Sequence, residues 1–121
     1  DRAMAWLVSM MNHGDRPNEV TMGVMCKAFA RRGLFLQVRA VMAALDSVGL
    51  PLNEYFFAAL ISACGLAEPP QPEIAVSAFR ELVARGLRPQ SVRHKLGLVI
   101  GVKATAELLG EVRAAGGPQA A

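Results

Sequence analysis

Apolar side chains recur along this chain at intervals of three and four residues, the spacing that places them on one face of an α-helix. Glycine and proline interrupt the pattern repeatedly, because glycine accepts the left-handed backbone that ends a helix and proline cannot continue one. The pattern therefore predicts an all-α fold. The expected helices span 2–13, 19–32, 34–48, the region around 56–64, 73–85, 92–100 and 104–115.

Each of the four central helices carries an apolar face, which we expect to be buried against neighbouring helices. In chain order these faces consist of Met22, Met25, Cys26 and Phe29; of Phe35, Val38, Val41, Met42 and Leu45; of Phe56, Phe57, Leu60, Ile61 and Cys64; and of Ile74, Ala75, Ala78, Phe79 and Leu82. The faces are too wide for isolated helices in water, so they predict a shared core.

The order of turns and helices is repeated. Asn18 precedes residues 19–53 and Asn53 precedes residues 54–90, and each asparagine is a good helix cap followed by a glutamate that suits the positive end of a helix. Both units are roughly 35 residues long, and the second contains a turn with three prolines at 68–72. This period predicts a right-handed α-solenoid of helix-turn-helix repeats.

The two ends of the chain fit the same scheme in part. Residues 1–18 match the second helix and closing turn of a preceding unit, and residues 91–121 form a shortened, degenerate or capping unit with a tail. Because the chain opens in the middle of a unit, we expect it to be part of a longer protein whose targeting segment lies outside it.

Composition narrows the class of protein. Hydrophobic residues make up 53% of the chain, which is ample for a packed core, and the net charge is +3. The longest uncharged stretch, 55–67, is too short to span a bilayer, so no membrane insertion is expected. Cys26 and Cys64 lie in apolar helix patterns without a nearby partner, which favours buried free thiols over a disulfide or metal site.

Catalytic and cofactor motifs are not found in the sequence. There is no Ser/His/Asp set and no glycine-rich phosphate loop, and Glu107 and Glu111 read as a solvated helix face. His13 and His94 have no partner at metal-ligand spacing. We therefore expect no enzyme activity, no metal or cofactor and no small-molecule substrate.

Several positions recur in phase with a known repeat. The first unit opens with Val20-Thr21 and closes with Gly49-Leu50-Pro51, and the second contains Phe-Phe-Ala-Ala-Leu-Ile-Ser-Ala-Cys at 56–64 and closes with Gly-Leu-Arg-Pro at 86–89. In these features the chain resembles the pentatricopeptide repeat family. A tetratricopeptide array is the alternative, but its period is one residue shorter and its Trp-x-x-Leu-Gly-x-x-Tyr start is missing from both units.

The resemblance implies that single-stranded RNA lies along the first helices of the units, in a mitochondrion or chloroplast, for RNA processing, stability or translation. It assigns the sandwiching of bases to Val20, Tyr55 and Val92, and base reading to Gly23 with Asn53, Ala58 with Gln90, and Lys95 in the shortened unit. Lys27 and Arg31 share a helix face with Val20 and Gly23, where they would meet phosphates.

The chain departs from the family pattern where bases would be read. Gly23 and Ala58 replace the usual Thr, Ser or Asn and have no polar side-chain atom, so only weak base specificity is expected. Asn53 also has a sufficient role as a helix cap. The alternative function is a protein-protein scaffold in a large assembly such as an organellar ribosome, favoured by the proline-rich turn and by exposed apolar residues near Trp6 and Met10.

Overall fold

The computed structural model describes residues 19–115, and this part of the chain folds as six packed α-helices and one short 3₁₀ helix. The expected helix at 2–13 and the tail at 116–121 lie outside the described residues. The elements are α2 (Glu19–Arg31), α3 (Phe35–Ser47), α4 (Glu54–Leu66), α5 (Pro72–Ala84), the 3₁₀ helix η1 (Pro89–Val92), α6 (Arg93–Ile100) and α7 (Val102–Ala114).

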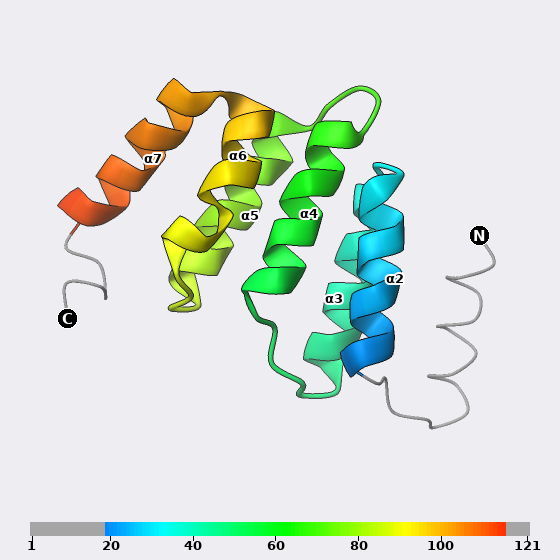
Figure 1. Ribbon diagram of the computed structural model, residues 1–121. Helices are drawn as coiled ribbons and strands as arrows, with labels where there is room; N and C mark the ends of the chain where they lie inside the picture. Colours follow the sequence, from blue (N-terminus) through cyan, green and yellow to red (C-terminus); the bar gives the residue numbers. More distant parts are fainter. Residues whose placement is uncertain (1–18, 116–121) are drawn as a thin grey trace.

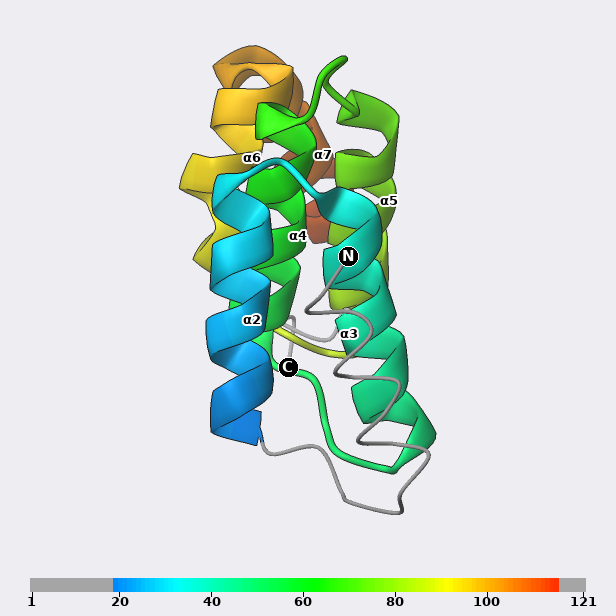
Figure 2. The same ribbon diagram turned by 90° about the vertical axis from the view of Figure 1, so that its right-hand side faces the viewer.

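The helices are arranged in two layers. Helices α2, α4 and α6 lie side by side in one layer, and α3 and α5 lie behind them (Figure 1, Figure 2). Helix α4 is central, because it packs against α2 and α6 in its own layer and against α3 and α5 in the other. Helix α7 packs against α6 at the far end of the described chain.

The core lies between the layers and is formed by the apolar faces that the sequence predicts. Phe56, Phe57 and Phe79 are its largest fully buried side chains. Three of the predicted core residues, Met25, Phe35 and Ile74, are only half-buried at the edge of the core. The remaining sixteen residues of the four predicted faces are all buried, so helical periodicity located the core well.

The turn between α2 and α3 requires glycine for two reasons. Gly33 has a φ of +70°, in the left-handed region that strains other residues. In addition, a Cβ atom at Gly33 would lie 2.5 Å from the carbonyl oxygen of Leu66, at the end of α4. The turn between α2 and α3 therefore packs directly on the backbone of α4. This contact fixes the α2–α3 pair against the α4–α5 pair.

The start of the third unit differs from the expectation of a single helix from 92 to 100. Pro89 begins a 3₁₀ turn, and the α-helix starts at Arg93. The last helix starts at Val102, two residues earlier than expected, because Gly101 with a φ of +96° turns the chain sharply between α6 and α7. The hydroxyl of Thr105 donates a hydrogen bond to the Gly101 carbonyl at 2.8 Å.

A group of polar contacts joins the two helices of the second layer. The guanidinium of Arg85, at the end of α5, donates hydrogen bonds of 3.2 and 2.9 Å to the two carboxylate oxygens of Asp46 in α3. Arg85 also bonds Glu81 and lies 5.6 Å from the centre of the Phe57 ring. Hydrogen bonding to Arg85 lowers the pKa of Asp46 below its ordinary value, so the carboxylate is charged at neutral pH.

Candidate nucleic-acid interface

The outer surface of the α2, α4 and α6 layer holds nearly all the residues that the sequence singles out for RNA. Lys27, Arg31 and Lys95 are exposed, Val20 is 75% exposed, and Tyr55 is 46% exposed. The backbone of the three helices brings them together, since α2 and α6 flank α4 (Figure 1). The surface is therefore continuous across the three helices.

A hollow of about 220 Å³ occupies the middle of this surface, and we call it the central hollow. Its floor comes from α4, and cationic side chains stand on both sides, from α2 on one and α6 on the other. Its lining consists of Lys27, Ala30 and Arg31 of α2; Tyr55, Ala58, Ala59, Ser62 and Leu66 of α4; and Lys95 of α6. The arrangement is a largely apolar floor between positive walls.

A second hollow of about 320 Å³ adjoins the first at Tyr55, which lines both. Its other lining residues are Val20, Gly23, Val24, Asn53 and Phe56. Since one aromatic ring borders both hollows, it forms the ridge that separates them. The sandwiching and reading positions expected at the first junction of units, Val20, Gly23, Asn53 and Tyr55, thus surround one depression.

The Tyr55 ring packs against Gly23 of α2. The Tyr55 hydroxyl donates a hydrogen bond of 3.1 Å to the Gly23 carbonyl. A Cβ atom at Gly23 would lie 3.4 Å from Cε2 of the ring, in ordinary van der Waals contact, so the ring packs closely against α2 at this position. The ring also meets Phe56 edge-on, with the ring centres 5.6 Å apart. Sequence spacing gave no sign of this contact between neighbouring units.

Asn53 caps helix α4, as expected. Its Oδ1 accepts a hydrogen bond of 2.9 Å from the backbone N–H of Tyr55, and its backbone is extended. The side-chain oxygen is therefore already bonded, and the amide nitrogen is the group that remains as a donor toward the second hollow. The cap also orients Tyr55, because the bonded N–H is that of the tyrosine itself.

The three cations of the central hollow form no salt bridge with a carboxylate in the described part of the chain. Within residues 19–115, every salt bridge is formed by Arg80, Arg85 or Arg88, and none of these lines the hollow. Glu54, at the start of α4, is bonded to the backbone N–H of Arg88, which lowers the pKa of the carboxyl group. The positive charge of the hollow is therefore open to a ligand.

Two of the residues expected to contact RNA do not lie on this surface. Val92 is 0% exposed, so the expectation that it supplies stacking surface is wrong; the 3₁₀ turn at Pro89–Val92 directs it into the core. Gln90 is exposed, but it lines a separate cleft with residues of α6 and α7 and does not join Ala58 in the central hollow. Ser62 of α4, which sequence analysis did not select, is the polar side chain on the floor of the central hollow.

The two cysteines of the described chain are buried. Burial raises the pKa of the Cys26 thiol to about 12 and that of Cys64 to about 11, so neither is a thiolate at neutral pH. Residues 19–115 hold no cluster of three His, Cys, Asp or Glu side chains that would bind a metal ion. No helix in this range is both long and apolar enough to cross a membrane.

No protein-family model matches the chain, and no curated protein matches it.

Proposed function

We propose that this protein binds single-stranded RNA along the α2, α4 and α6 layer, as an organellar α-solenoid of the pentatricopeptide type. The observation that carries the proposal is the central hollow. Cations from α2 and α6 stand on either side of an α4 floor that contains an aromatic ring. A single strand presents phosphates and bare base faces at once, and this surface offers partners for both.

The charge of the hollow suits a phosphate backbone. Lys27, Arg31 and Lys95 have no salt-bridge partner within the described residues, so a phosphate would not have to displace a carboxylate. Contacts of this kind release counterions from the nucleic acid, and they carry most of the affinity of sequence-independent binding. The net charge of +3 is small, so the local arrangement matters more than the total.

Tyr55 is the stacking platform of the proposed site. Its ring is held by the hydrogen bond to Gly23 and by the edge contact with Phe56, yet 46% of the residue remains exposed. Stacking of a base on an aromatic side chain is worth about 1–3 kcal/mol and does not depend strongly on which base it is. A ring that is fixed beforehand loses little conformational entropy on binding.

Base specificity should be weak at this site. Gly23 and Ala58 offer no side-chain donor or acceptor, and Oδ1 of Asn53 is used by the helix cap. The remaining donors near the floor are the amide of Asn53 and the hydroxyl of Ser62. Affinity should thus depend on strandedness and salt more than on sequence, and a mitochondrial or chloroplast location follows from the resemblance alone.

A binding experiment tests the proposal. Fluorescence anisotropy would compare a labelled unstructured RNA strand with a duplex of equal length and with the DNA strand of the same sequence. In the groove variant, Lys27, Arg31 and Lys95 are replaced by alanine. The strand should bind more tightly than the duplex, and the groove variant should lose affinity for it by a factor on the order of ten.

The matched control replaces Arg39, Arg80 and Arg113, which are exposed on α3, α5 and α7, by alanine. It removes the same charge from other surfaces, and it should change affinity less than about two-fold. Equal losses in both variants would attribute binding to total charge and would refute this site. If the wild-type chain binds no strand at all, RNA binding is wrong.

A protein-protein scaffold is the second candidate, and exposed apolar residues favour it. Val24 is 64% exposed, Leu98 is 74% exposed and Val102 is 76% exposed. Side chains of this kind are common at protein interfaces. A scaffold would retain partner binding in the groove variant and lose it on replacement of the apolar residues, the reverse of the outcome for RNA.

A further inference from the structure

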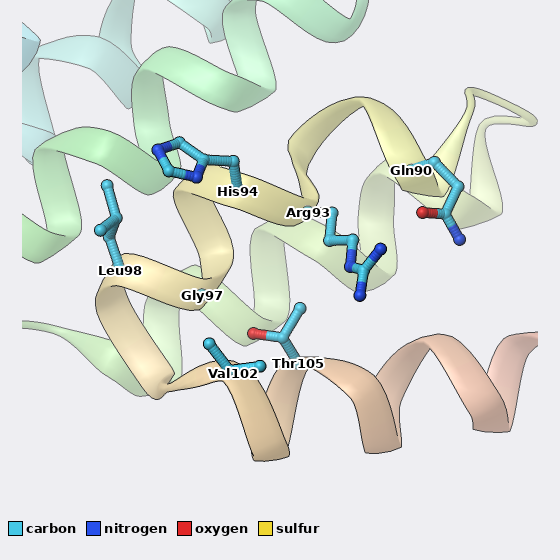
Figure 3. A pocket seen from close by; sticks show the side chains of 7 residues that line it. All are labelled: Gln90, Arg93, His94, Gly97, Leu98, Val102 and Thr105. Atoms are coloured by element: carbon cyan, nitrogen blue, oxygen red, sulfur yellow. The ribbon is translucent and has the colours of Figure 1, made fainter.

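A third hollow in the described chain lies outside the proposed RNA site, between α6 and the beginning of α7. It has a volume of about 610 Å³, within the range of about 300–1,000 Å³ that is typical of small-ligand sites. We call it the α6–α7 cleft. Its lining consists of Gln90, Arg93, His94, Gly97, Leu98, Val102 and Thr105 (Figure 3).

The walls of the cleft differ in chemistry. Figure 3 shows the Arg93 side chain extending from α6 toward α7, with Val102 and Thr105 pointing back toward α6. The Thr105 hydroxyl is bonded to the Gly101 carbonyl, so this part of α7 offers mainly apolar contact. Leu98 and Val102 are 74% and 76% exposed, so two large apolar side chains of the lining are uncovered.

Arg93 is available to an anion. Within residues 19–115 it takes part in no salt bridge. A guanidinium presents its N–H groups in a planar fork that matches two oxygens of a phosphate. The amide of Gln90, in the turn before α6, adds a further donor to the same cleft.

We propose that the α6–α7 cleft binds one phosphorylated nucleotide, with the phosphate on Arg93 and the base against Val102. The volume suits one such unit, and the pairing of a cation with uncovered apolar side chains matches a molecule that is anionic at one end and flat and apolar at the other. The nucleotide is either the phosphorylated end of the RNA strand or a free mononucleotide. If the ligand is the phosphorylated end of the RNA strand, the inference rests on the proposed RNA binding. A strand in the central hollow would pass close to the cleft, since Lys95 of the hollow and His94 of the cleft are adjacent on α6.

Mononucleotide binding to the cleft is measured by methyl NMR on Val102 and Thr105. The probes are adenosine 5′-monophosphate, adenosine and inorganic phosphate. The monophosphate should bind at least about ten times more tightly than either fragment, since it makes both sets of contacts. Shifts equal for all three probes, or no shift at Val102, would contradict a free nucleotide site.

Two variants and a control localise the effect. Arg93→Ala should reduce the affinity for the monophosphate to that for adenosine. Gly97→Leu should abolish both, because a Cβ atom there lies in ordinary contact with Thr105 at 3.8 Å and the longer side chain extends into the cleft. Arg113→Ala removes an exposed α7 cation outside the lining and should change nothing. Circular dichroism checks that each variant is folded.

Short RNA strands with a 5′-phosphate, a 3′-phosphate or no terminal phosphate distinguish the two possible ligands, the phosphorylated strand end and the free mononucleotide. A terminal phosphate that increases affinity several-fold in the wild type but not in Arg93→Ala identifies the strand end as the ligand. Binding of the monophosphate without an effect of the terminal phosphate identifies the free nucleotide, even if RNA binding itself fails. The proposal is overturned if neither the monophosphate nor the phosphorylated strands affect Val102, even where RNA binds the central hollow.

Discussion

At the scale of single residues, two glycines make contacts with a neighbouring helix that their positions in the sequence do not indicate. Gly33 ends a helix, as the sequence indicates, but it also touches the backbone of α4 at Leu66. Gly23 lacks the polar side chain that the resembled family uses to read a base. Its carbonyl oxygen, however, accepts the hydrogen bond from the Tyr55 hydroxyl. Contacts between units cannot be read from periodicity within one helix, and for this reason sequence analysis missed both.

The role of Gly33 can be measured against Gly49, which also has a positive φ but has nothing within 4 Å of an added Cβ. Gly49→Ala should cost about 1–2 kcal/mol of unfolding free energy, the cost of the left-handed backbone alone. Gly33→Ala should cost at least about 2 kcal/mol more, because the backbone of Leu66 must move. Urea unfolding measures both, and equal losses would show that the contact is unimportant.

Asn53 is expected to serve both the fold and the site, and two substitutions separate the roles. Asn53→Ala removes the cap acceptor and should lower the unfolding free energy by about 1 kcal/mol. Asn53→Asp keeps the acceptor and should leave stability within about 0.5 kcal/mol, but its charge should weaken RNA binding several-fold. Thermal unfolding and anisotropy are measured on the same samples. Unchanged RNA affinity in Asn53→Asp would remove Asn53 from the site.

At the scale of elements, helix positions follow from the sequence to within one or two residues, except at the start of the third unit. Apolar spacing and the Gly and Pro turns determine α2 to α5 locally, and their observed bounds agree with the pattern. Near residue 92 the local signal is weak: the pattern shows apolar residues but cannot distinguish a 3₁₀ turn from the first turn of an α-helix. The stacking role of Val92 was implied by the family resemblance, and in the structure Val92 is buried.

The contact between α3 and α5 through Asp46 and Arg85 should depend on pH. The folded-state pKa of Asp46 is lower than its ordinary value of 3.8, so the pair stabilises the fold above about pH 4 and its contribution is lost as the pH falls through the lowered pKa. Because Asp46 is 43% exposed, Asp46→Ala should cost no more than about 1 kcal/mol at neutral pH.

Urea unfolding at several pH values measures this dependence. The difference between wild type and Asp46→Ala should shrink as the pH falls below about 4. Glu107→Ala is the control, since Glu107 is exposed and forms no salt bridge within the described residues. A difference that stays constant down to low pH would show that Asp46 acts through packing and not through its charge.

At the scale of the whole molecule, the two layers differ in how their charged side chains are used. The second layer joins its helices through Arg85 and Asp46, whereas the first layer presents its cations to solvent. Helical spacing grouped Lys27 and Arg31 with Val20 on one face of α2, whereas the α4 and α6 residues of this surface were selected by the family resemblance. Sequence analysis could not place Ser62 or the α6–α7 cleft, which depend on how neighbouring helices meet.

The salt dependence of RNA affinity tests the central claim most directly. If Lys27, Arg31 and Lys95 each contact a phosphate, replacing all three by alanine should reduce the slope of log affinity against log salt by about 2, at about 0.7 per contact with a single strand. The control variant of Arg39, Arg80 and Arg113 should keep the wild-type slope. An unchanged slope in the groove variant, or an equal reduction in both variants, would contradict RNA binding on this surface.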